Sequence, residues 1–492
     1  MTAGCQIERR SPVSVLNMLL VCGALTPFAA SVIVRLGGEF TYWRMLALAV
    51  VSAGAYASML VGLLASFRNS GRIGLIVFVA GMLFWFYGPS VVAALSTDQW
   101  ATTAARVVTS NDDASLAFLL IALFGVIVTV GYRLRFGDRV SRRLARALSG
   151  RGRISWQSWI VAASILWLLG FVFYMLAADG LSNAIALARL SRSGEKPWSF
   201  RGNYGTAVTP FHVLATYALV VSSGAMNYAA VRARCSLLGK ALLAASSAFA
   251  MTWVATESGT RSLLIQCALP PLILIAVEEY ARNRGVRARW IVVGVLVAGM
   301  LLVAANAQRQ YRTTSAVAGI SIDLQDNDFL LATAQAVSVR KAEADENLGG
   351  FILLDLLAGP IPRVLWPGKP RSRVVPVFTR YIWGIDIEER GGNYLPSIVG
   401  QAYLAWGWLG GIYIALVVGF AIGAGDRVFG ENPKMVLRFF WAQAVAYLFV
   451  AFRMVAFGYF GAVYVGAGII VVGRAVEAAR SRLERRPAGC RG

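Results

Sequence analysis

The sequence predicts an all-α, polytopic integral membrane protein, and its composition carries the prediction. Of 492 residues, 57% are hydrophobic and 15% are charged, whereas soluble domains carry about a quarter charged residues. The apolar residues come in blocks of about 20, the length of helix that crosses a hydrocarbon core of about 30 Å. A single histidine leaves room for few zinc or iron sites and few histidine-based acid–base schemes.

About twelve transmembrane helices are expected. The first apolar block follows Glu8-Arg9-Arg10 without a small-residue cleavage site, so we expect a retained helix rather than a signal peptide. The expected spans cover residues 13–35, 42–66, 73–95, 115–135, 156–179, 207–231, 237–254, 260–281, 288–307, 396–424, 434–451 and 454–473.

The distribution of positive charge predicts the orientation of these helices. Lys and Arg number 47 against 25 Asp and Glu, a net charge of +22. The arginines concentrate in alternate loops, above all in 132–155 and in the C-terminal tail, which is the positive-inside pattern. Both termini are therefore expected in the cytoplasm of a multi-pass membrane protein. A nucleic-acid partner is not expected, because the same charges mark topology.

Four regions follow from this reading. An N-terminal transmembrane bundle of about nine helices spans 1–307, and a large periplasmic loop spans 308–395. C-terminal transmembrane helices follow over 396–473, and a basic cytoplasmic tail over 474–492. No P-loop, Rossmann glycine pattern, HExxH or CxxC occurs, so neither a metal nor another cofactor is expected.

The most specific stretch is IPRVLWPGKPRSR, residues 361–373 of the large loop. Five prolines between Pro360 and Pro376 predict a stiff, extended path rather than a regular helix. A rigid run of cations suits a polyanionic ligand, because guanidinium groups bind phosphate oxygens in a bidentate manner. A solvated basic loop, or one resting on anionic headgroups, is the alternative. The candidate ligand-binding cations are Arg363, Lys369, Arg371, Arg373 and Arg380.

Three further external connections carry arginines. The tight turn 257–261 leaves Arg261 at the mouth of a helix, where an ionisable residue is a functional candidate; snorkelling to headgroups is the alternative. Arg309 and Arg312 follow another span on the same side, and Arg453 lies in the short last external turn. These connections could converge arginines on one pocket.

Three motifs resemble a known family. GTRSLL at 259–264, IPRVLWPGKP at 361–370 and NYLPSIVGQAYLAWGWLGG at 393–411 look like the bacterial O-antigen and oligosaccharide repeat-unit polymerases of the Wzy type. The resemblance covers roughly 255–411, and the N-terminal half is similar in topology only. It implies a GT-C-like glycosyltransferase architecture.

The implied activity joins undecaprenyl-pyrophosphate-linked repeat units into O-antigen, capsule or exopolysaccharide chains on the periplasmic face. The anomeric centre would invert, and the pyrophosphate lipid would leave. By this resemblance Arg261, Arg363 and Lys369 contact the pyrophosphate, and Tyr394 joins the substrate-binding candidates. The implied partners are lipid-linked glycans, membrane lipids and a candidate chain-length regulator.

Such a reaction needs a base that deprotonates a sugar hydroxyl, a task that a carboxylate in a dry pocket can perform. The candidates are Glu257, Asp355 and Glu388, with Glu389 beside the last. A structural ion pair is the alternative for each. His212 lies at the external start of a span, where a structural role is the more usual one. The sequence does not choose among the carboxylates.

Other functions stay open at this point. O-antigen ligases resemble this family but use a histidine in the large loop, which this loop lacks. Asp112-Asp113 resembles the acidic pair of polyprenyl-phosphate-dependent monosaccharide transferases, although those enzymes carry it in the first external loop and here it lies in the second. A lipid-linked oligosaccharide flippase is the alternative of another class. A flippase would place charges inside its spans, and the expected mid-span regions are nearly free of charge.

Overall fold

The computed structural model confirms a helical, multi-pass membrane protein. Throughout the part of the chain that it describes, every regular element is a helix. Nine of the described helices are long and apolar enough to cross a membrane, and Met435–Ala451 is a shorter apolar helix. The described residues are 12–38, 41–66, 72–95, 110–149, 154–189, 208–258, 261–283, 329–342, 348, 366, 368, 374–384, 395–430, 434–453 and 461–484.

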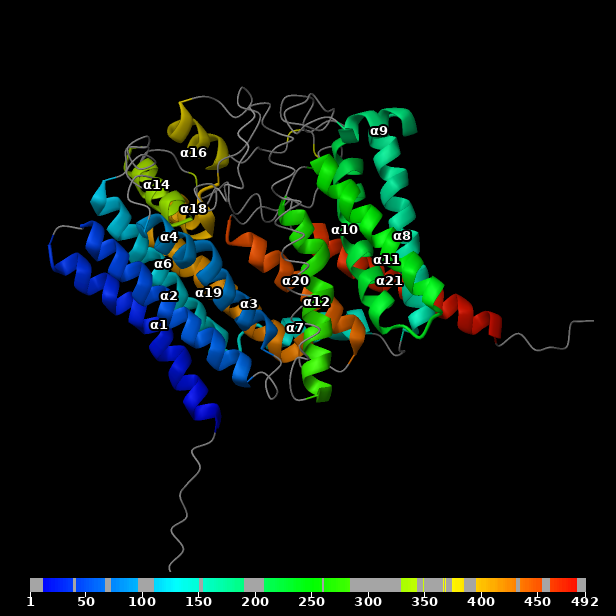
Figure 1. The fold of residues 1–492 in the computed structure, drawn as a ribbon, viewed down its shortest axis with the longest axis horizontal. Helices are drawn as coiled ribbons and strands as arrows, with labels where there is room; N and C mark the ends of the chain where they lie inside the picture. Colours follow the sequence, from blue (N-terminus) through cyan, green and yellow to red (C-terminus); the bar gives the residue numbers. More distant parts are fainter. Residues whose placement is uncertain are drawn as a thin grey trace, which may run out of the picture.

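The helices form two bundles around two hydrophobic cores (Figure 1). The first bundle is built around a core that α3 and α6 share with the short helices α14 and α18. Its members are α1 (Pro12–Leu36), α2 (Tyr42–Ser66), α3 (Ile73–Met82), the π-helical turn η2 (Leu83–Tyr87), α4 (Gly88–Leu95), α6 (Asn111–Arg133), α14 (Phe329–Ala342), α18 (Ser397–Trp406) and α19 (Trp408–Gly425). α16 (Val374–Trp383) packs on the exposed side of α14 and α18.

The second bundle surrounds α10, which is the most completely buried of its apolar spans. α20 passes between the two bundles in Figure 1 and contributes to the second core. The members are α7 (Asp138–Ser149), α8 (Trp156–Ala177), α9 (Leu181–Arg189), α10 (Val208–Arg232), α11 (Leu237–Ser258), α12 (Arg261–Asn283), η4 (Asp426–Gly430), α20 (Met435–Ala451) and α21 (Gly461–Glu484).

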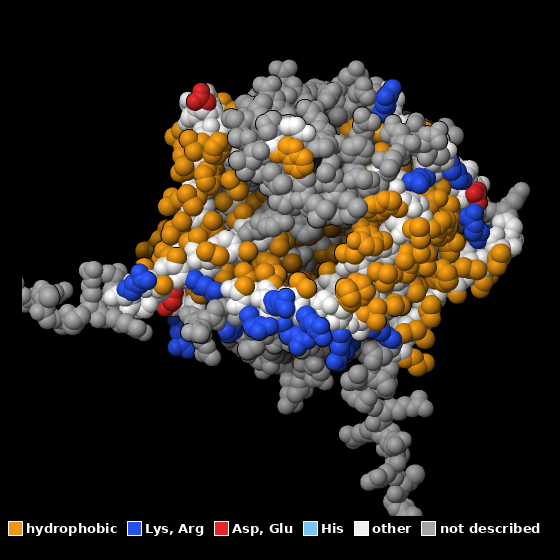
Figure 2. Space-filling model, turned by 180° about the vertical axis from the view of Figure 1, so that it is seen from behind, with side chains coloured by type: hydrophobic (Ala, Val, Ile, Leu, Met, Phe, Trp, Pro, Cys, Tyr) orange, Lys and Arg blue, Asp and Glu red, His pale blue; other side chains and the backbone are white. Residues whose placement is uncertain are grey.

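Basic side chains gather at one end of the bundles. Figure 2 shows Lys and Arg as a band along the lower edge, where α6 ends and α7 lies, beneath wide hydrophobic flanks. We call this the inner end, and the end where α6 begins the outer end. The same view shows a hollow between the two flanks.

The single span expected over 396–424 is wrong, because the chain breaks into α18 and α19. Gly407 adopts φ +63° between them, a conformation that glycine reaches without steric cost. A Cβ on Gly410 would lie only 2.0 Å from the carbonyl oxygen of Ala402. α19 therefore folds back along α18 instead of continuing it.

Two helices lie within the large loop expected over 308–395. α14 is buried from Phe329 to Val339 and belongs to the first core. α16 contains Pro376 at its third position, where a proline costs no intrahelical hydrogen bond, so the extended path does not reach this last proline. The expected span 288–307 lies outside the described residues.

Candidate functional site

α14 and α18 form a parallel pair of half-length helices. The hydroxyl groups of Thr333 and Ser397 lie 2.8 Å apart, and Arg340 donates to the carbonyl oxygen of Leu404. Both contacts join residues 64 positions apart in the chain, so the two helices run in the same direction and stay in register. The two helices pack closely against each other, because Gly400 of α18 presents no side chain to α14.

The pair begins inside the first bundle. Pro396, which has no N–H, precedes α18, and Ser397 adopts φ +67°, a costly conformation for a residue with a side chain. Its hydroxyl accepts from the amide of Gly400 at 2.9 Å, and the Ile398 amide donates to the Phe452 carbonyl at 3.0 Å. The start of α18 is thus fixed against the end of α20.

Arg453 lies at this inner start of the pair. Its guanidinium carbon is 6.0 Å from the centre of the Trp85 ring, an arrangement in which the ring face attracts the cation. Trp85 lies 5.5 Å from the ring of Phe329, the first residue of α14, and its indole N–H donates to the Phe449 carbonyl at 2.7 Å. The Arg453 Nε is buried and has no hydrogen-bond partner among the described residues.

The turn that contains Arg453 lies level with η2, in the middle of the α3–η2–α4 run. The expected external position of this turn stays a prediction. The cation lies against an aromatic ring, and the preceding residue, Phe452, accepts a hydrogen bond from the start of α18, whose dipole favours negative charge. The unpartnered N–H would satisfy its hydrogen-bonding need with an anionic oxygen.

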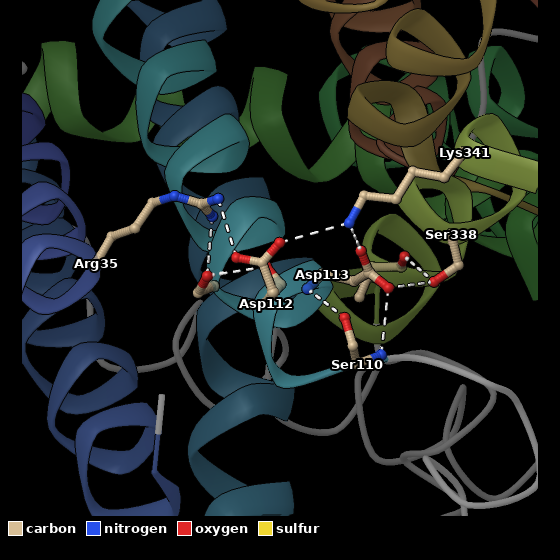
Figure 3. Close-up of polar contacts among 8 residues, drawn as sticks. Arg35, Ser110, Asp112, Asp113, Ser338 and Lys341 are labelled. Carbon is tan, nitrogen blue, oxygen red and sulfur yellow. Dashed lines mark hydrogen bonds and ion pairs between the residues drawn. The ribbon is translucent and has the colours of Figure 1, made fainter. Parts of the chain in front are cut away.

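An ion-pair cluster lies at the outer end of the first bundle, where α14 ends and α6 begins (Figure 3). Asp113, which is 4% exposed, accepts from the Ser338 hydroxyl at 2.7 Å, from the Ser110 amide at 3.2 Å and from the Lys341 ammonium group. The Asp113 amide in turn donates to the Ser110 hydroxyl at 3.1 Å, so that Ser110 caps α6. The start of α6 and the end of α14 thereby meet on one buried carboxylate.

Asp112 makes the exposed half of this cluster. It pairs with Arg35 of α1 at 3.0 Å and with Lys341 at 3.4 Å. The hydrogen bond from Lys341 to Asp113 raises the pKa of the lysine above its usual value. Both carboxylates are thus occupied by cations and hydroxyl groups, and the described residues contain no group of three His, Cys, Asp or Glu side chains placed to hold a metal ion. The pair fastens α14 to α6 and α1.

The remaining candidates are distributed as follows. Arg380 is exposed on α16, and the His212 ring lies 6.1 Å from that of Tyr174 on α8. The backbones of Glu257 and Arg261 end α11 and begin α12, while their side chains lie outside the described set, so convergence of the arginines stays a prediction. The other candidates also lie outside it: Asp355, Glu388, Glu389, Arg309, Arg312, Arg363, Lys369, Arg371, Arg373 and Tyr394.

Sequence reasoning missed Trp85, Lys341 and Ser338. In the sequence, Trp85 is one of several aromatic residues in an apolar span, and no local pattern predicts the π-helical turn that contains it. Such turns are frequent at functional sites. Lys341 and Asp113 are 228 residues apart. Ser110-x-x-Asp113 does carry a local signal, since a hydroxyl followed by an acid three residues later is typical of a helix start.

No family model, curated protein or solved structure matches the chain. The geometry of the site therefore carries the functional argument alone.

Proposed function

We propose that the chain is a glycosyltransferase of the bacterial inner membrane that polymerises undecaprenyl-pyrophosphate-linked oligosaccharide repeat units on the periplasmic face. The observation that supports it best is Arg453: a cation inside the first bundle, held over Trp85, with a buried N–H that lacks a partner among the described residues. An arginine at membrane depth is costly and marks a functional site by default. A phosphate group attached to a membrane lipid is the anion that can reach such a depth.

The proposed reaction needs stabilisation of the negative charge that develops on the leaving pyrophosphate. The hydroxyl group of an incoming repeat unit attacks the anomeric carbon of the growing chain, and the bond to the pyrophosphate lipid breaks with inversion. Arg453 would neutralise charge on the leaving pyrophosphate, which is usually the largest contribution to catalysis of this kind. Glu257, Asp355 and Glu388 remain the candidates for the base.

The proposed topology has about twelve spans, with 288–307 as one of them and both termini in the cytoplasm. The band of described basic residues at the inner end supports this orientation (Figure 2), because cytoplasmic loops carry the excess of Lys and Arg. The outer end, with α14, α16 and the acidic pair, then faces the periplasm.

Substitution of Arg453 tests the proposal. Arg453→Gln should lower polymerisation of purified lipid-linked repeat units by about 10²–10³-fold, the usual cost of one preorganised donor. Arg453→Lys should stay impaired, because an ammonium group lacks the planar fork. Arg234→Gln, which removes an exposed cation from the inner end, should retain full activity. Chains of normal length and amount from Arg453→Gln at a matched protein level would overturn the role.

Arg261 and Arg363 test the same proposal at positions that the resemblance selects. Replacement of either by Lys keeps the charge and removes bidentate geometry, so lipid-linked single repeats should accumulate. An arginine that only snorkels to headgroups would tolerate Lys.

A lipid-linked oligosaccharide flippase is the second candidate, and the depth of Arg453 favours it more than an external turn would. The two functions separate in detergent solution, where no membrane has to be crossed. Polymer formation by the purified protein from lipid-linked repeats would support the polymerase. Its absence, together with substrate trapped on the cytoplasmic face in cells that lack the protein, would support the flippase.

A further inference from the structure

The amphipathic helix α7 lies at the inner end and has two distinct faces. One face is buried in the second core through Ala145 and Leu148. The opposite face is exposed and carries four arginines with apolar residues between them. The exposed arginines are Arg139, Arg142, Arg143 and Arg146.

Both ends of α7 are fixed by arginines from other elements. Arg427 of η4 binds the Asp138 carboxylate through Nε at 3.0 Å and Nη2 at 2.8 Å. It also donates to the carbonyl oxygen of Tyr132 at 2.9 Å. At the other end Arg474 of α21 donates to the last carbonyl groups of α7, including that of Ala147 at 3.1 Å. The helix is therefore held in place without its outward cations.

Three of the outward cations, Arg139, Arg142 and Arg143, have few contacts with the described residues. Arg139 and Arg143 form no ion pair with the described residues, and Arg142 donates only to the carbonyl oxygen of Asp138 within its own helix. Four like charges on three turns repel one another. An arrangement of this kind is stabilised by an anionic partner outside the chain.

Apolar side chains on the same face identify the partner. Val140 and Leu144 are 71% and 43% exposed, and their four-residue spacing puts them on one side of α7. Phe136, in the turn that precedes the helix, is 83% exposed. A soluble polyanion such as a nucleic acid makes no use of such a stripe, whereas a bilayer surface buries it and binds the flanking cations through its phosphate groups.

We propose that α7 is an interfacial helix that binds anionic phospholipid headgroups of the cytoplasmic leaflet. Phe136, Val140 and Leu144 enter the headgroup–acyl boundary, and the arginines bind headgroup phosphates. In Figure 2 the basic band borders the hydrophobic flank at the height where headgroups would lie. The inference uses the proposed orientation but not the proposed reaction, so its failure leaves the glycosyltransferase proposal untouched.

Lipid binding to the full-length protein tests this inference. Native mass spectrometry in neutral detergent would measure binding of phosphatidylglycerol and of phosphatidylcholine. Each basic residue near an anionic surface contributes about fivefold in affinity, so the combined variant Arg139→Gln, Arg142→Gln and Arg143→Gln should bind phosphatidylglycerol about 100-fold more weakly. Phosphatidylcholine binding should change little. The corresponding variant with three lysines should keep most of the affinity and shows that the helix still folds.

A matched control carries the same loss of charge at the same end. Arg234→Gln, Lys240→Gln and Arg482→Gln together should leave phosphatidylglycerol binding within about threefold, because these cations lie outside α7. Equal loss in this control would overturn the assignment to α7. Val140→Ser with Leu144→Ser keeps every cation and should still weaken binding. Unchanged binding there would overturn the interfacial helix and point to a soluble polyanion.

Discussion

Removal of the Asp113 carboxylate should release α14 from α6. Asp113→Ala deletes the charged hydrogen bond to Ser338, about 1.5–3 kcal/mol, and the pair with half-exposed Lys341, about 0–1 kcal/mol. The docking of α14 should thus weaken by about 2–3 kcal/mol. Loss of the hydrogen bond from the Ser110 amide to the Asp113 carboxylate, one half of the capping box, should loosen the first turn of α6 by about 1 kcal/mol. The buried position of Asp113 makes the loss larger than at its exposed neighbour.

Hydrogen exchange of the α14 amides measures this loss directly, because the helix opens locally at a free energy set by its docking. At 1.4 kcal/mol per tenfold, exchange over Phe329–Ala342 should rise by about 30- to 150-fold in Asp113→Ala. Asp112→Ala removes only surface pairs and should raise it by less than about fivefold. Equal effects of the two variants, or unchanged exchange in Asp113→Ala, would refute the proposed role of the buried carboxylate.

Further predictions concern packing, pH and topology. Gly419→Val should lower the free energy of unfolding by about 1–3 kcal/mol, because a Cβ there would lie 2.4 Å from a backbone carbonyl of α6. Gly411→Val is the control, since a Cβ at Gly411 meets nothing within 4 Å. Thermal unfolding in detergent compares the two variants. Hydrogen bonds from the start of α8 lower the pKa of Glu477 from 4.5 to about 2, so its contribution to stability should be complete above about pH 4.5 and lost as the pH falls through about 2. Melting temperatures of Glu477→Gln should therefore approach those of the parent protein only at the acid end. Reporter fusions at Ser149 and Gly368 should report the cytoplasm and the periplasm, and both on one side would overturn the span count.

Periodicity and hydropathy were sufficient for the long helices. Apolar blocks predicted the spans at 42–66 and 156–179 to within two residues of α2 and α8. The prediction succeeds because the length of a spanning helix is set by the number of consecutive apolar residues, which the sequence shows directly. Hydropathy does not show, however, where the chain reverses its direction between two apolar helices. α18 and α19 are both apolar, so the reversal at Gly407 is invisible in a hydropathy pattern and depends on a backbone conformation.

The candidate site was only partly predictable. Arg453 was selected because it lies in the short turn between two apolar blocks, yet its position beside Trp85 depends on where α20 ends against the α3–η2–α4 run. The ion pair of Lys341 with Asp113 joins residues that no local pattern relates. Folding places them together through the packing of α14 on α6.

The close contact between α6 and α19 has a mechanical consequence. Positions for a Cβ on Gly419 and Gly423 lie 2.4 and 2.3 Å from carbonyl oxygens of Val128 and Tyr132, so the two backbones touch without side chains between them. No side chain between the two helices can change rotamer to accommodate a shift, so the two helices must move together as one rigid body. α6 carries Asp113 at its outer end and leads into α7 at its inner end, about 34 Å away. A displacement of α7 at the inner end is thus transmitted to Asp113 and the docked α14 at the outer end as a rigid-body motion.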